Sequence, residues 1–103
     1  MALTKKFKDT VVKRAQIDPE FKRELLRQSI NEFLSGDLDV AKALLRDYIN
    51  ATSQFESIAK DLNKNTKSIQ RMLGPNGNPT AENLTALLKV LQKREGIKFE
   101  VKP

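Results

Sequence analysis

Apolar residues recur along most of this 103-residue chain at intervals of three and four, the spacing typical of amphipathic helices. Six helices are expected, separated by polar turns, with no internal repeat and no linker between them. In the second of these helices the periodicity predicts an inward face of Leu26, Ile30, Phe33 and Leu34. The pattern therefore predicts an all-α domain.

Capping residues predict where these helices begin and end. The first helix is expected over about 4–16, and the second begins with Asp18 as its N-cap and Pro19 as its first residue. Gly36 and Gly96 are typical of helix C-termini. The other expected N-caps are Asp37, Ser53, Asn65 and Thr80.

The last residues, "IKFEV", break the helical pattern because apolar and polar side chains alternate there. This alternation predicts a short β-strand over 97–101, with Ile97, Phe99 and Val101 on one face. No second run of the chain has that pattern, and a lone strand leaves its backbone groups unpaired. Two interpretations stay open: a tail packed on the bundle, or a strand that pairs with a second copy or another protein.

Length and composition restrict the classes of function. A chain of this length is expected to form a single domain over 1–103, with N-terminal helices over 4–52, a core over 53–95 and the strand at its end. Cysteine and histidine are both absent, which excludes Cys/His metal sites and imidazole-based catalysis. We therefore expect no enzyme, no cofactor and no metal. No run is apolar enough for a membrane span or a signal peptide, so a cytoplasmic protein is expected.

The net charge of +6 and the pI near 9.7 direct attention to nucleic acid, since neutralising phosphates supplies most of the affinity of such binders. The segment around residues 55–73 meets the requirements of a helix-turn-helix. Ala59 is the small residue where the second helix crosses the first, Asn63 tolerates a left-handed turn, and Asn65 caps the second helix. Ile69 and Met72 would face inward.

The remaining positions of that second helix carry hydrogen-bonding groups suited to base edges and phosphates. The predicted DNA-binding residues are Asn65, Thr66, Lys67, Ser68, Gln70 and Arg71. From Leu62 through Ala81 there is no Asp or Glu. Ser53 and Gln54, at the start of the preceding helix, and Lys64, in the turn, are predicted phosphate contacts.

The stretch "FESIAKDLNKNTKSIQRMLGPNGNPTAENLTALLKVLQ" resembles the helix-turn-helix of the lambda Cro/C1 (XRE) type. More narrowly, "LRDYINAT", "GPNGNPT" and the closing "GIKFEV" are similar to segments of HigA-like addiction-module antidote proteins. Asn63 for the usual glycine and Lys64 for the usual apolar residue depart from the general pattern. The resemblance implies a lambda-repressor-like bundle with extra N-terminal helices and adds Asn76 and Asn78 as phosphate contacts.

The resemblance also implies a function and partners. The expected protein is a sequence-specific repressor that binds double-stranded DNA as a homodimer, represses its own operon and binds a RelE-like toxin. A standalone XRE-type regulator without a toxin has the same sequence features. The alternative from another class is a protein-interaction module that sequesters a partner, with the basic amphipathic segment "LTKKFKDTVVKRAQ" as its binding element.

Overall fold

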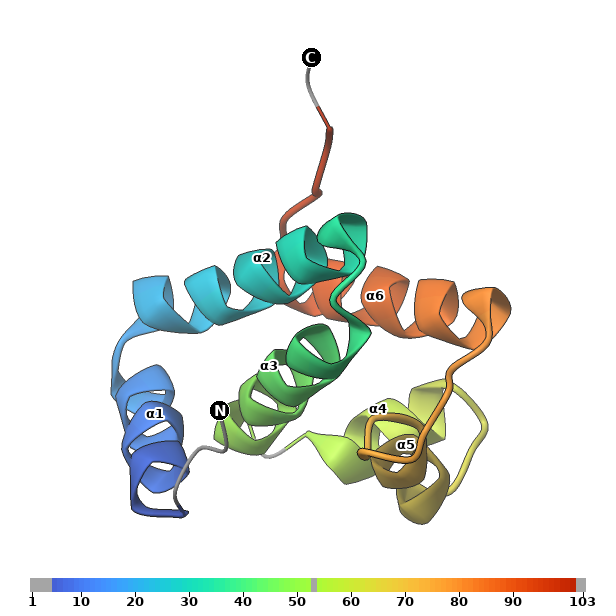
Figure 1. Ribbon diagram of the computed structural model, residues 1–103, viewed down its shortest axis with the longest axis horizontal. Coiled ribbons are helices and arrows are strands. Elements are labelled where there is room, and N and C mark those ends of the chain that lie inside the picture. The colour runs from blue at the N-terminus through green and yellow to red at the C-terminus, as the bar shows by residue number, and fades with distance from the viewer. Residues whose placement is uncertain (1–4, 53, 102–103) are drawn as a thin grey trace.

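The computed structural model describes residues 5–52 and 54–101, with side chains described from residue 10 onward. Within these ranges its elements are all helices, which confirms the predicted all-α class. In chain order they are α1 (Lys5–Ile17), α2 (Pro19–Ser35), α3 (Leu38–Thr52), α4 (Phe55–Asp61), α5 (Thr66–Met72) and α6 (Ala81–Glu95). Figure 1 shows α2 and α6 along the top of the molecule, α3 beneath them, α1 to one side and the short pair α4 and α5 to the other.

The predicted caps define most of these helix ends. The Asp18 carboxylate accepts hydrogen bonds from the backbone N–H groups of Glu20 and Phe21, and Pro19 is the first helical residue of α2. Gly36 and Gly96 end α2 and α6 with left-handed backbones, at φ values of 88° and 68°. Asp37 Oδ1 accepts from the Val40 N–H, and Thr80 Oγ1 accepts from the Asn83 N–H. These caps are therefore confirmed.

One predicted boundary is shifted. Ser53 was expected to cap the fourth helix, but Ser53 lies outside the described residues. In the structure α4 begins at Phe55, so Gln54 takes the N-cap position and makes no capping hydrogen bond with its side chain. The α4 N-terminus thus has a weaker local signal than the starts of α2, α3, α5 and α6, where a side chain caps the helix, and this weaker signal explains the shifted boundary.

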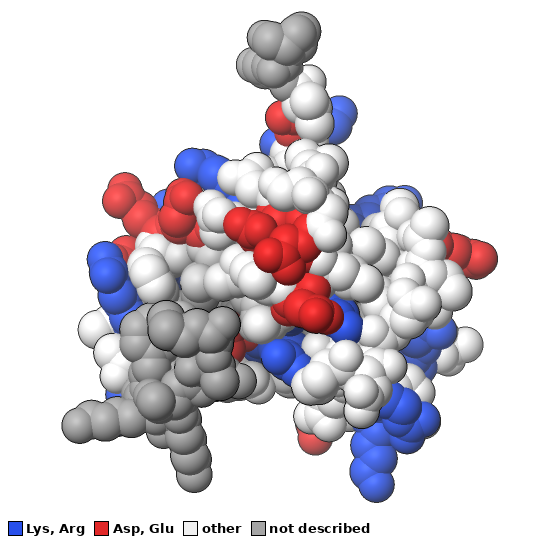
Figure 2. Space-filling model, in the orientation of Figure 1, with Lys and Arg blue, Asp and Glu red and all other residues white. Residues whose placement is uncertain are grey.

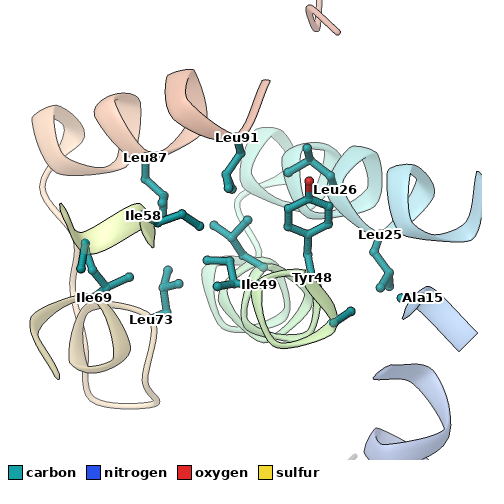
Figure 3. Packing of buried hydrophobic residues seen from close by; sticks show 13 residues of the cluster. Ala15, Leu25, Leu26, Tyr48, Ile49, Ile58, Ile69, Leu73, Leu87 and Leu91 are labelled. Atoms are coloured by element: carbon teal, nitrogen blue, oxygen red, sulfur yellow. The ribbon is translucent and has the colours of Figure 1, made fainter. Parts of the chain in front are cut away.

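The core lies where α2, α3, α4, α5 and α6 meet, and Figure 3 shows its apolar side chains pointing toward one another. Leu26, Ile49, Ile58, Ile69 and Leu87 are fully buried and belong to one contiguous cluster. Because the cluster takes side chains from both the N-terminal helices and the short pair α4 and α5, both halves of the chain contribute to one core.

The predicted inward face of α2 needs one correction. Leu34 was expected inside, but it is 66% exposed, whereas Leu25 is buried. Leu34 lies in the last turn of α2, next to the exposed turn around Gly36, where helical periodicity continues but no neighbouring helix covers it. Periodicity reports which residues share a helix face, not how far the neighbouring helices extend.

A partly buried polar network links three helices above the core. The Tyr48 hydroxyl, from α3, donates a 2.6 Å hydrogen bond to Glu95 Oε1 at the end of α6. Lys22 Nζ, from α2, forms a 3.0 Å ion pair with the same oxygen. Burial and the bond to the Glu95 carboxylate raise the pKa of Tyr48 well above its ordinary value of 10.0, so this hydroxyl stays protonated and keeps donating.

The predicted C-terminal strand is not seen. No residue in the described ranges is in a strand, and the segment 97–101 is extended without a pairing partner. Its backbone is instead bonded to α6, since the Ile97 N–H donates to the Gln92 carbonyl and the Phe99 N–H donates to Gln92 Oε1. Ile97 and Phe99 pack against the core, while Val101 is 80% exposed where the chain projects away from the helices (Figure 1).

Candidate nucleic-acid interface

The turn between α4 and α5 has the backbone expected for a sharp change of direction. Asn63 has a positive φ of 55°, in the left-handed region that asparagine tolerates better than most residues. The Lys64 N–H donates to the Ala59 carbonyl over 2.8 Å and the Asn63 N–H donates to the Lys60 carbonyl, so the free carbonyls at the end of α4 are satisfied. Ala59 is buried, which lets α5 approach α4 closely.

The second helix of this pair is capped and amphipathic. Asn65 Oδ1 accepts a 2.7 Å hydrogen bond from the Ser68 N–H, as predicted, which leaves only the amide nitrogen of Asn65 free to donate to a ligand. Ile69 and Leu73 are fully buried, and Met72 is half-buried against the core. One face of α5 therefore anchors the helix.

The opposite face of α5 carries the predicted groups into solvent. Lys67, Gln70 and Arg71 are exposed, at the i, i+3 and i+4 spacing that puts side chains on one helix surface. Thr66 and Ser68 are half-buried beside them. Figure 2 shows Lys and Arg side chains projecting at the lower right, the corner that α5 occupies in Figure 1. This face presents two permanent cations and an amide on a fixed helix.

The loop that follows α5, over 74–80, contacts both Lys42 of α3 and the backbone of α5. Lys42, on α3, is buried and its Nζ donates to the carbonyls of Gly74 and Gly77 over 2.9 and 2.6 Å. Gly77 lies so close to the last turn of α5 that a Cβ there would collide with the carbonyl oxygens of Arg71 and Met72. Only glycine allows this approach, so residue 77 decides the path of the loop.

The loop and α5 together enclose a hollow of about 430 Å³. Five predicted residues line it: Lys64, Ser68, Arg71, Asn76 and Asn78. The N-cap residue Thr80 lies on its far side, so the positive end of the α6 dipole borders it too. Lys64 is exposed, at a position where the general helix-turn-helix pattern has an apolar residue. Together, Lys64 and Arg71 give the hollow two cations, and no acidic residue lines it. We call it the basic hollow.

Not every predicted contact lies there. Lys67 and Gln70 are outside the basic hollow, on the outer surface of α5. Gln54 lines a separate, smaller hollow with residues of α1, α2 and α3, and its Oε1 is buried with no hydrogen-bond partner among the described residues. Ser53 lies outside the described residues. The structure therefore brings the turn, α5 and loop residues together and leaves Gln54 apart from them.

The basic hollow and the outer face of α5 carry groups suited to binding anions and hydrogen-bonding ligands. Their groups are ammonium, guanidinium, amide and hydroxyl donors, which bind phosphate oxygens and base edges. In the described part of the chain no group of three Asp or Glu side chains is placed to hold a metal ion. No helix in that part is long and apolar enough to cross a membrane.

Sequence reasoning missed two residues of this site, Lys42 and Gly77. A signal for Lys42 existed, because it stands four residues after Leu38 and three before Leu45, in the apolar stripe of α3. A lysine in such a stripe needs acceptors inside the fold.

Comparisons with models of known families, with curated proteins and with solved structures found no match.

Proposed function

We propose that this protein is a sequence-specific DNA-binding repressor in which α4, the turn over 62–65 and α5 form a helix-turn-helix. The observation that carries the proposal is the two-sided character of α5. Its inner face is fixed by the buried Ile69, while Lys67, Gln70 and Arg71 are exposed on the outer face. A rigid, exposed helix with these groups suits the major groove, where Arg pairs with guanine and Gln with adenine.

The basic hollow supplies the second half of the proposed interface. Lys64, Asn76 and Asn78 contact backbone phosphates beside the groove, and these contacts fix the register of α5 on the duplex without reading sequence. Ser68, which lines the basic hollow, and Thr66, half-buried in the first turn of α5, bond phosphate oxygens that α5 brings close. The division predicts distinct effects for the two sets of residues, since phosphate contacts govern the salt dependence and base contacts govern discrimination.

The repressor acts in the cytoplasm as a homodimer that reads two half-sites about 34 Å apart. The extended segment 97–101 is the proposed place of a two-fold contact, because its outer residue Val101 is exposed and no strand pairs with the segment in the described part of the chain. In a toxin–antitoxin module the repressor also binds a RelE-like toxin. The resemblance of the "GPNGNPT" and "LRDYINAT" segments to HigA-like antidote proteins supports that role.

A partner-sequestering module is the second candidate function. The observation that favours it is the corner between α2 and α3, where Leu34, Leu38 and Val40 are exposed, at 66%, 36% and 42%. Apolar side chains grouped at an exposed turn are typical of protein contacts. Co-expression with the product of a neighbouring gene, followed by co-purification, separates the two roles, since variants of α5 should leave a protein complex intact.

The proposed function is tested by competition between the DNA upstream of the protein's own gene and a scrambled duplex, at about 0.15 M salt. The variant Lys67→Ala/Arg71→Ala should lose the preference of the wild type. Its matched control is Lys89→Ala/Lys93→Ala on α6, which removes the same charge from exposed positions outside the basic hollow. Wild-type protein that binds both duplexes equally would refute the proposal.

A further inference from the structure

Lys42 occupies an unusual place for a lysine. It is only 2% exposed, although lysine side chains are almost never fully buried without partners. Two of its three donors are used by the carbonyls of Gly74 and Gly77. The remaining partner is Asp39, 3.8 Å away, whose side chain is 88% exposed, so that ion pair is screened by water. The two carbonyls are therefore the main acceptors for this ammonium group.

Gly74 and Gly77 lie 32 and 35 residues after Lys42 in the chain, so these hydrogen bonds join distant segments. Gly74 and Gly77 are already bonded to each other, because the Gly77 N–H donates to the Gly74 carbonyl over 2.9 Å. Lys42 adds a charged donor to both ends of that turn. Between and beyond these glycines lie Asn76 and Asn78, which line the basic hollow.

We propose that Lys42 is a positioning residue for DNA binding, which holds the loop over 74–80 in the conformation that presents Asn76 and Asn78 to a backbone phosphate. The inference rests on the proposed function of α5 and the basic hollow. In this proposal α3, in the N-terminal half of the chain, belongs to the DNA-binding unit. Lys42 acts through the loop that it bonds and does not itself contact the nucleic acid. Charge-assisted bonds to carbonyls suit this role, because they are stronger than neutral ones and are protected from solvent here.

The test compares full-length wild type with Lys42→Met, which keeps the unbranched side chain up to its Cε position and removes the ammonium donors. Lys22→Met is the matched control, since Lys22 likewise joins segments that are distant in the chain, through its ion pair with Glu95 at the end of α6 rather than with the loop. Affinity for the upstream duplex is measured at several salt concentrations, and amide hydrogen exchange reports the protection of the Gly77 N–H. Circular dichroism shows whether each variant is folded at the temperature used.

Lys42→Met should bind about tenfold more weakly at each salt concentration, because the hydrogen bonds from Asn76 and Asn78 to a backbone phosphate are lost. Its slope of log affinity against log salt should stay that of the wild type, since neutral amides displace no counterions. Its base preference should remain that of the wild type, and the Gly77 amide should exchange faster. Lys22→Met should keep the wild-type affinity and the wild-type Gly77 exchange. Gly77→Ala, which displaces the same loop without substituting Lys42, should reproduce the weaker binding if Lys42→Met is not folded.

Two results would overturn the inference alone: a Lys42→Met variant with the wild-type affinity, or a Lys22→Met variant that loses as much affinity as Lys42→Met. The second outcome would mean that general destabilisation, rather than loop positioning, controls affinity. A wild-type protein without any preference for its upstream duplex would instead overturn the proposed function and this inference with it.

Discussion

Gly77→Ala is the substitution whose effect the structure determines most closely. A Cβ at residue 77 would collide with the carbonyl oxygens of Arg71 and Met72 and with the carbonyl carbon of Met72. These are backbone atoms in the last turn of α5, so no side-chain rotation relieves the contact. Overpacking of this kind costs about 1–3 kcal/mol. The stiffer unfolded chain offsets about 0.4–1 kcal/mol, which leaves a net loss of roughly 1–2 kcal/mol in the free energy of unfolding.

The loop can avoid the collision only by moving away from α5, which also breaks the bond from Lys42 to the Gly77 carbonyl. Urea unfolding followed by circular dichroism measures the loss of stability, and DNA binding below the unfolding transition measures the displacement of the loop. Gly74→Ala is the matched control three residues earlier. A Cβ there would lie 3.4 Å from the carbonyl oxygens of Gln70 and Arg71, an ordinary contact, so stability should be unchanged or slightly raised.

Equal stabilities of Gly77→Ala and Gly74→Ala would contradict this steric account, because a Cβ is sterically excluded at residue 77 and not at residue 74. A Gly77→Ala variant that is destabilised as expected but binds DNA with the wild-type affinity would also contradict it. In that case the loop would stabilise the fold without contributing to the interface.

Three further predictions concern the polar network, the turn and the groove-facing side. Tyr48→Phe should lower the free energy of unfolding by about 1.5–3 kcal/mol at neutral pH, since a bond to a charged acceptor is lost. The raised pKa of Tyr48 means that this stabilisation is fully present below about pH 10 and is lost as the pH rises further. In denaturant titrations at several pH values, the free energies of unfolding of wild type and Tyr48→Phe should therefore converge above about pH 10. A difference that stays constant with pH would contradict the assignment. Asn63→Ala should lower the free energy of unfolding by about 1–2 kcal/mol because of the positive φ at residue 63. Asn63→Gly should cause no measurable loss in urea unfolding, since glycine adopts this backbone freely. Equal losses in the two variants would be inconsistent with a strained turn. Arg71→Ala should cost about 1–3 kcal/mol of specific binding and relax preference at one base pair in competition assays; a uniform loss across sequences would assign Arg71 to phosphate instead.

The local chemistry of the chain predicted most of the helices. Asp18, Gly36, Asn65 and Thr80 each determine a helix end through one bond or one backbone conformation, and such signals do not depend on distant parts of the fold. The left-handed Asn63 was predictable for the same reason. The outward face of α5 followed from the burial of Ile69, because a helix fixes where its other side chains point.

The features that escaped prediction depend on contacts across the chain. The acceptors of Lys42 lie more than 30 residues away, so its burial could not be assigned to the loop from local pattern. The exposure of Leu34 depends on where α3 begins to cover α2. The alternation in "IKFEV" is compatible with a strand, but a strand also needs a second one, and Gln92 satisfies the Phe99 N–H instead.

Selection of bound sites from a random pool of DNA duplexes tests the central claim most directly, because it requires no assumption about the operator. We expect one enriched sequence with two inverted half-sites whose centres are about one helical turn apart, as a two-fold repressor requires. The same selection with Lys67→Ala/Arg71→Ala should enrich no sequence or a different one. A wild-type selection that enriches no sequence would contradict the claim that α5 reads DNA.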